Sequence, residues 1–221
     1  MNKTQRLWRW LGLIFVLSFG ALGYLGWQIH LQAPPIPTAV STPDGDVLFT
    51  GEEVQLGQQV WLASGGQQQG SVWGHGAYVA PDWSADWLHR EAVALGETHS
   101  KLRFKAPAAA APEDRAAIAS LVRSEMRRNT YDEATGRVIV SPARAQAIRE
   151  VATHYSGVFG DAPAFNELRE QYAMTNGTVP DATDRKALTA FFFWTSWAAA
   201  TTRKLRRRRP TRSRACALRH P

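Results

Sequence analysis

Histidines are the residues of this 221-residue chain whose chemistry would best suit a metal ion or acid–base catalysis. Three of them, His75, His89 and His99, are separated by 14 and 10 residues. A helix presents two ligands on one face only at a spacing of three or four residues, so this spacing does not favour a zinc site. The simpler interpretation is that His75 hydrogen-bonds within its glycine-flanked turn and that His89 caps a tryptophan-lined helix face. We interpret His30 as an interface residue.

Paired carboxylates form the second set of candidates, Asp82 with Asp86 and Glu52 with Glu53. Both pairs lie where helices are expected to begin, and carboxylates are favoured there by the helix dipole, so we interpret them as structural. The chain contains no G-x-S-x-G, Walker or G-x-G-x-x-G motif. Its only cysteine is Cys216, which excludes an intrachain disulfide and a C-x-x-C-H haem attachment. The residues therefore predict no catalytic, cofactor-binding or metal site.

The stretch from Trp61 to Glu91 must position any site that does exist. It holds four tryptophans, two histidines and five glycines. Glycine adopts positive φ angles and indoles bury large areas, so we expect a compact loop that leads into a helix starting near Asp82 or Ser84.

The composition places the chain among globular proteins, with 44% apolar and 20% charged residues. The formal charge of +7 suggests a nucleic-acid or anionic-lipid partner, but nine of the 26 basic residues lie in 203–221. Without them, 17 basic residues face 19 acidic ones, so we expect no nucleic-acid partner for the rest of the chain. The tail 203–221 has no apolar periodicity and is predicted to be disordered. We interpret it as coding sequence read out of frame; a basic binding arm is the alternative.

The N-terminal segment is predicted to cross a membrane. Residues 1–10 form a basic end and 11–29 a transmembrane helix, in which Leu11 to Trp27 carries no charge and nine of Leu, Ile, Val or Phe. Aromatic residues flank this run on both sides, about 25 Å apart at 1.5 Å per residue. The positive-inside rule places the basic end in the cytoplasm. A cleaved signal peptide is the alternative, although no proline-free small-x-small site follows.

A proline-rich spacer is expected over residues 30–46, followed by an outer domain over 47–202. A capping box of Thr50 and Glu53 opens its first helix, and residues 130–140 are predicted to form a hairpin with Gly136 in the turn. Helical periodicity and caps predict a mainly α domain, with helices over residues 50–63, 84–95, 112–128, 142–159, 163–174 and 180–202.

The apolar run Ala187 to Thr201 is the one segment that resembles a second membrane span. It has only fifteen uncharged residues and a charged lead-in, so we expect a core helix, with a second crossing as the alternative. Its cluster of Phe191 to Trp194 with Trp197 is then core packing; exposed, it would mark a docking face.

Four segments carry a family resemblance: GQQVW, GSVWGHGAYVAPDWSADWLHREA, YAMTNGTV and LTAFFFWTSWAAATTR. They resemble the N-terminal region of the quinol-dependent nitric-oxide reductases, single-chain members of the haem-copper oxidase superfamily. The resemblance covers about residues 51–203 and the preceding anchor. It implies a transmembrane helix in the bacterial cytoplasmic membrane, followed on the periplasmic side by a domain that resembles cytochrome c without its haem.

The resemblance also implies an activity, reduction of two nitric oxide molecules to nitrous oxide with electrons from quinol. The family's haem b groups and non-haem iron are bound by later transmembrane helices, and no position here matches those ligands. We therefore expect an inactive N-terminal portion without cofactors, whose partners are membrane lipid, the catalytic bundle, quinol and nitric oxide. The aromatic content of Trp61 to Glu91 motivates the hypothesis that this stretch caps the bundle. A membrane-anchored interaction module without catalysis is the alternative.

Overall fold

The computed structural model describes residues 3–74, 77–103 and 111–202, which divide into two units. One contains residues 1–35 and 203–221, and the other is the folded domain, Ile36–Thr202. The expectations for His75, Cys216 and the tail 203–221 lie outside the described residues.

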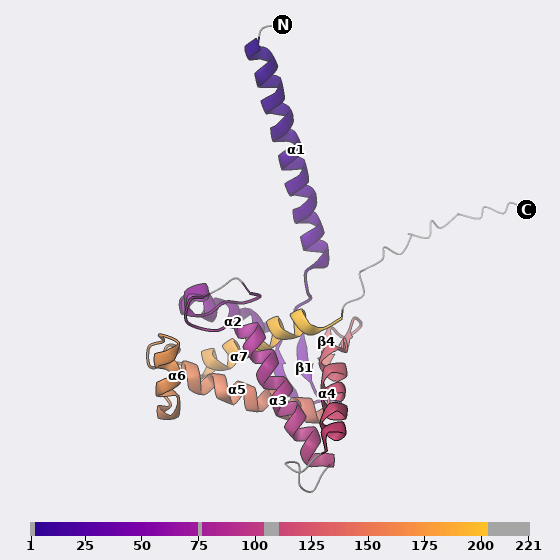
Figure 1. The fold of residues 1–221 in the computed structure, drawn as a ribbon, viewed down its shortest axis with the longest axis vertical. Helices are drawn as coiled ribbons and strands as arrows, with labels where there is room; N and C mark the ends of the chain where they lie inside the picture. The colour runs from indigo at the N-terminus through magenta and orange to yellow at the C-terminus, as the bar shows by residue number, and fades with distance from the viewer. Residues whose placement is uncertain (1–2, 75–76, 104–110, 203–221) are drawn as a thin grey trace, which may run out of the picture. The chain divides into compact units, whose positions relative to one another are not determined.

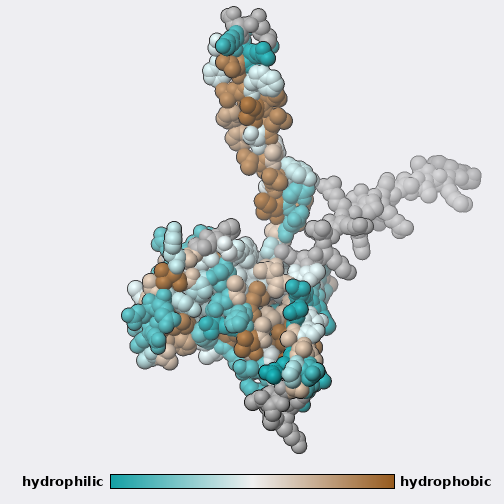
Figure 2. All heavy atoms as spheres, in the orientation of Figure 1, coloured by the Kyte–Doolittle hydropathy of each residue, from teal (hydrophilic) through white to brown (hydrophobic). Residues whose placement is uncertain are grey.

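The first unit contains a single 30-residue helix, α1 (Lys3–Gln32), drawn in indigo in Figure 1. It is long and apolar enough to cross a membrane, and no other helix in the described ranges meets that criterion. Figure 2 shows hydrophobic side chains along most of its length and hydrophilic ones near its start. The helix extends beyond the predicted 11–29 at both ends, since the basic end is helical from Lys3. A signal sequence near an N-terminus would meet the same criterion, so that alternative stays open.

The domain begins with a small sheet of strand order β2-β1-β4-β3. The strands are β1 (Ala39–Ser41), β2 (Val47–Thr50), β3 (Tyr131–Asp132) and β4 (Arg137–Ile139). The hairpin of β3 and β4 confirms the prediction for residues 130–140, with Gly136 at φ +69°. In contrast, β1 lies inside the segment expected to be an extended spacer. It is ordered by antiparallel pairing with β2 and parallel pairing with β4, so the domain starts earlier than composition predicts.

The helices of the domain follow local signals closely. They are α2 (Gly51–Ala63), α3 (Trp83–Arg103), α4 (Pro112–Arg127), α5 (Pro142–Phe159), α6 (Asn166–Gln171) and α7 (Ala182–Ala200), with short 3-10 turns at Gly66–Gln69 and Pro163–Phe165. The predicted capping box is present: the Thr50 amide donates to Glu53 at 2.8 Å, and the Glu53 amide donates to the Thr50 hydroxyl at 3.2 Å. Two predicted boundaries are wrong. Helix α3 continues eight residues past Leu95, and the helix expected over 163–174 is only Asn166–Gln171 after a 3-10 turn.

Helix α7 lies at the centre of the core, which confirms the core-helix interpretation of the apolar run. Every residue from Ala187 to Ala198 is buried, and the helix runs beside α2, α3 and α5 (Figure 1). Its contact with α2 is close, because a Cβ on Gly57 would lie 2.0 Å from the Ala187 carbonyl oxygen. The aromatic cluster of α7 packs inward, with Phe193 against Phe49 at 5.7 Å between ring centroids.

A second, smaller apolar cluster joins α3, α4 and α5. Its buried members are Leu95, Ile118, Val122, Met126 and Ala147. Helix α4 is attached to the domain largely through this cluster, and its members Ile118, Val122 and Met126 also form the floor of a groove described below.

Candidate functional site

The stretch from Trp61 to Glu91 connects α2 to α3 through tight turns. Helix α2 ends at Ala63, and Gly65 at φ +112° turns the chain into the 3-10 segment Gly66–Gln69. Gly70, at φ +120°, lies against the Trp83 indole, where a Cβ would approach Nε1 to 2.2 Å. The Trp61 indole donates to the Gly70 carbonyl oxygen at 3.4 Å. The glycines therefore serve both positive φ angles and close packing, as the composition predicts.

Asp82 fastens the following loop to the start of α3. One carboxylate oxygen accepts from the Ser71 hydroxyl at 2.9 Å and from the Gly74 amide, and the other accepts from the Ala85 amide at 2.9 Å. The last contact occupies an amide that has no partner within the helix, so Asp82 acts as an N-terminal cap. Asp86, the other carboxylate of the predicted pair, lies in the first turn of α3. Both carboxylates therefore lie at the start of a helix, as the sequence analysis expected.

Trp73 is an exposed aromatic residue of this loop. Its backbone lies at φ +60°, a region that non-glycine residues rarely occupy, and its amide donates to the Ser84 hydroxyl at 3.2 Å. Its indole donates to the Thr195 carbonyl oxygen at 2.9 Å yet remains 47% exposed. Tyr78 and Val79 are exposed as well. We call Trp73, Tyr78 and Val79 the loop patch.

The other three indoles of the stretch are buried inside the domain itself. Trp83 and Trp87 have no exposed surface, and Trp61 is 8% exposed. Trp83 lies edge-on to Tyr155 and Phe159, at 5.9 and 5.2 Å between ring centroids. Most of the aromatic residues of the stretch thus belong to the core of the domain. Their number therefore gives less support to the hypothesis that the stretch caps the catalytic bundle. Among the four indoles, that of Trp73 keeps the surface for an external contact, together with its exposed neighbours in the loop patch.

Glu91 ends the stretch with a buried ion pair that the sequence analysis missed. The Arg144 side chain on α5 donates from Nε to Glu91 at 2.6 Å, and the two side chains are 2% and 1% exposed. The Trp87 indole donates to the second carboxylate oxygen at 2.9 Å. The sequence did contain a signal for a buried acidic residue. Glu91 follows Trp83 by eight residues and Trp87 by four, which places it on the same buried helix face.

A second polar cluster surrounds Asp86 on the same helix. Asp86 accepts from Arg90, four residues later on the same helix, at 2.8 Å, and from the Tyr155 hydroxyl at 2.5 Å. Burial, with the negative charge of Asp86, raises the pKa of Tyr155 far above its ordinary value. Burial also lowers the pKa of His154 to about 4, and the Arg90 charge acts in the same direction. These shifts keep both side chains neutral at neutral pH.

The described histidines do not converge. His89 lies exposed on the outer side of α3, away from the buried tryptophans, so the expectation that it caps their face is wrong. His99 contacts Glu125 at 3.0 Å, and Glu125 also accepts from the Ser141 hydroxyl. Because the carboxylate lies between histidine and hydroxyl, this trio lacks the serine–histidine contact of a nucleophilic triad. In residues 3–74, 77–103 and 111–202, no three His, Cys, Asp or Glu side chains gather in a metal-binding group.

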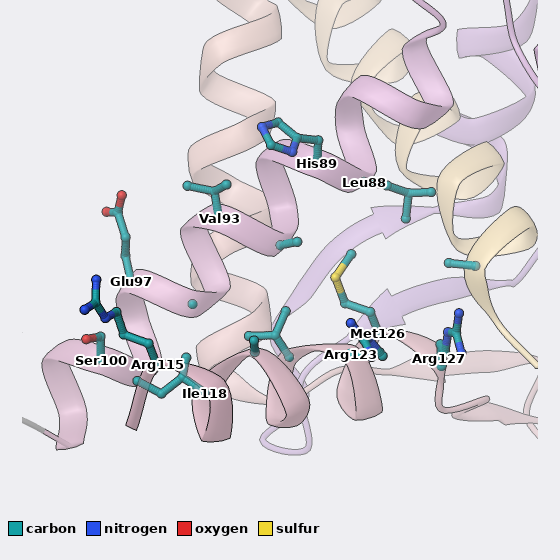
Figure 3. Close-up of a pocket in the computed structure, with 15 residues that line it drawn as sticks. Leu88, His89, Val93, Glu97, Ser100, Arg115, Ile118, Arg123, Met126 and Arg127 are labelled. Carbon is teal, nitrogen blue, oxygen red and sulfur yellow. The ribbon is translucent and has the colours of Figure 1, made fainter. Parts of the chain in front are cut away.

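A groove between α3 and α4 is a concave site among the described residues of the domain (Figure 3). It has a volume of about 660 Å³, within the range of ligand pockets. Its floor is apolar and includes Leu88, Ile118 and Met126, while arginines of α4 line one edge.

These features define the class of the molecule: a small, mainly helical domain with a short sheet and an aromatic core, following one helix able to cross a membrane. Residues 37–208 match the family described as the cytochrome c-like domain of the nitric oxide reductase NorB, and the chain belongs to this family. A comparison with curated proteins found no match. The family is membrane-bound, and it implies haem in the full-length protein.

The described residues of this domain do not fit a haem. Covalent attachment needs a C-x-x-C-H motif, which the sequence lacks, and the centre of the core is filled by Trp83 and the rings around it. Phe192 stacks on Trp83 at 5.6 Å, and Tyr172 lies edge-on at 5.9 Å between ring centroids. Side chains therefore occupy the interior space that a prosthetic group would need.

Proposed function

We propose that this chain is the N-terminal portion of a quinol-dependent nitric-oxide reductase. In the complete enzyme, haem b groups and a non-haem iron on later transmembrane helices would reduce two nitric oxide molecules to nitrous oxide. The observation that carries the proposal is the family match over residues 37–208, directly after a helix of membrane-spanning length. The chain itself would be catalytically inactive, because the chemistry requires those metal centres.

In this proposal the domain Ile36–Thr202 is a haemless extracytoplasmic cap of the bacterial cytoplasmic membrane. Helix α1 holds it there with its basic end in the cytoplasm, as the positive-inside rule favours for Lys3, Arg6 and Arg9. The loop patch is the surface of the stretch 61–91 that would face the catalytic bundle. Support comes from Trp73, whose indole is fixed by a hydrogen bond to α7 while nearly half of its surface stays exposed.

Expression of the whole chain in bacterial membranes tests the assignment. We expect membranes containing it to show no additional haem absorption and no quinol-driven consumption of nitric oxide. Haem bands that copurify with the chain would overturn the claim of inactivity.

Sequencing the genomic DNA past codon 203 tests whether the chain is a portion of a longer reductase. A frame encoding a series of apolar helices supports the reductase, whereas a genuine stop codon would favour an anchored interaction module.

Orientation is tested separately by protease added to intact spheroplasts. The domain should be digested from the outer side, and a tag placed before Lys3 should be protected. The reverse pattern would exclude the extracytoplasmic placement.

A further inference from the structure

The groove between α3 and α4 combines an apolar floor with a basic edge. Ile118, Val122 and Met126 form the floor from α4, at positions four residues apart, and each is less than 10% exposed. On the α3 side, Gly96 contributes no side chain. A Cβ there would only touch Val122 and Ile118 at 3.9 and 4.0 Å, so the groove is open at this point.

Three arginines stand along the α4 edge, Arg115, Arg123 and Arg127. They are eight and four residues apart, so they fall on one side of the helix, about 12 and 6 Å apart along its axis. All three are exposed, and within the described ranges none has a carboxylate within 4.0 Å. The acidic residue that lines the groove, Glu97, pairs with Lys101 at 3.6 Å.

We propose that this groove binds an acidic amphipathic helix of a partner protein. From Leu88 to Ser100 the groove follows α3 for about 18 Å, the length of about three helical turns. A helix of that length would lay apolar residues on the floor and present carboxylates, repeated every four residues, to the row of arginines. Apolar contact supplies the affinity, and the charged edge sets orientation and partner choice.

The spacing of the charges distinguishes this occupant from a lipid or a fatty acid. An anionic amphiphile carries its charge at one end and would use one of the three arginines. A row of cations extending about 18 Å along the helix axis matches a partner whose negative charge is distributed along its length. The inference does not depend on the redox activity of the complete enzyme.

A displayed library of 15-residue helices tests the proposal. The apolar positions are fixed as leucine at i, i+3, i+4 and i+7, and the flanking positions vary among Glu, Gln and Lys. Selection against the whole chain in detergent micelles should enrich Glu at positions four and eight residues apart along one flank. Enrichment of Lys, or no enrichment over the starting library, would overturn the proposal.

Variants of the chain locate the binding on the groove. A selected peptide should bind Arg123→Glu about three- to tenfold more weakly by fluorescence anisotropy, since reversal removes one exposed pair and adds a repulsion. Arg128→Glu makes the same change of net charge just outside the groove and should bind within about twofold of the parent. Equal losses in the two variants would mean general charge attraction and would contradict the proposal. Gly96→Met, which fills the groove without adding charge, should abolish binding, while circular dichroism shows a melting temperature no lower than that of the parent.

Competition by dodecanoate below its micellar concentration distinguishes the lipid alternative. The proposed helix site predicts little displacement of the peptide. Displacement at micromolar dodecanoate that is lost in Arg123→Glu would identify a fatty-acid site instead and would contradict the proposal.

Discussion

Glu91 and Arg144 form an ion pair 2.6 Å long between α3 and α5, with both side chains almost completely excluded from solvent. Removing two charges from water costs several kcal/mol per ion, and the pair offsets that cost only while both partners are present. The Trp87 indole supplies one further hydrogen bond to the carboxylate. The pair therefore couples the stability of α3 to its packing against α5.

We expect Arg144→Ala to lower the free energy of unfolding by about 3–5 kcal/mol, because it leaves Glu91 buried and uncompensated. Urea denaturation followed by tryptophan fluorescence measures the change. The control is Arg149→Ala on the same helix, whose pair with Asp46 is about half exposed and should contribute less than about 1 kcal/mol. The double variant Glu91→Leu with Arg144→Met should recover most of the loss. Equal effects of the two single variants would contradict this account.

Asp82→Ala should loosen the loop that presents Trp73. It removes a helix cap and two loop contacts, and we expect a loss of about 1–2 kcal/mol in urea denaturation. Limited proteolysis should then cut between residues 71 and 82 faster than in the parent. Asp44→Ala changes an exposed carboxylate in the turn between β1 and β2 and should leave both measurements unchanged. A loop that resists protease in Asp82→Ala would show that Asp82 does not fasten it.

His154 should make the domain less stable in mild acid. Its pKa is lowered from 6.5 to about 4 by burial and then by the Arg90 charge, with Asp86 opposing. Between those values the unfolded chain binds a proton that the folded domain does not, so stability falls as the pH decreases from about 6.5 toward 4. His154→Gln should reduce the difference in urea midpoint between pH 7 and pH 5. His89→Gln, at an exposed site, should leave that difference unaltered, and a greater effect there would contradict the assignment.

Two glycines in helices should respond to alanine with opposite signs. Gly57 touches the backbone of α7, so Gly57→Ala forces the helices apart and should cost about 1–3 kcal/mol. Gly96 faces open space in α3, so Gly96→Ala should stabilise the domain by up to about 1 kcal/mol through helix propensity. Thermal unfolding by circular dichroism measures both. A stabilised Gly57→Ala variant would mean that α2 and α7 do not approach so closely.

Local signals in the sequence predicted the helices well. Ser141 before Pro142 and Asp181 before Ala182 cap α5 and α7 through their side chains. Such signals reside in neighbouring residues and need no knowledge of the fold. The end of α3 was missed because Gly96 resembles a stop signal, whereas its helical neighbours pack against α4 and continue the helix.

The features that depend on distant residues could not be predicted. Strand β1 has three residues, and one of its two pairings is with β4, about a hundred residues later in the chain. The pair of Glu91 with Arg144 and the groove between α3 and α4 likewise arise only when helices meet. The absence of catalytic, cofactor-binding and metal residues stays a prediction, since no comparison tests it.

The intimate fit of α7 against α2 has a consequence for biosynthesis. The ribosome makes the central helix of the core last, some 130 residues after the helix that it covers. Until then Trp61 lacks its contact with Phe191, and Phe49 lacks its contact with Phe193. The nascent domain therefore exposes hydrophobic surface to solvent. Synthesis of this domain thus leaves a period in which a chaperone, or rapid completion of its final segment, protects it from aggregation.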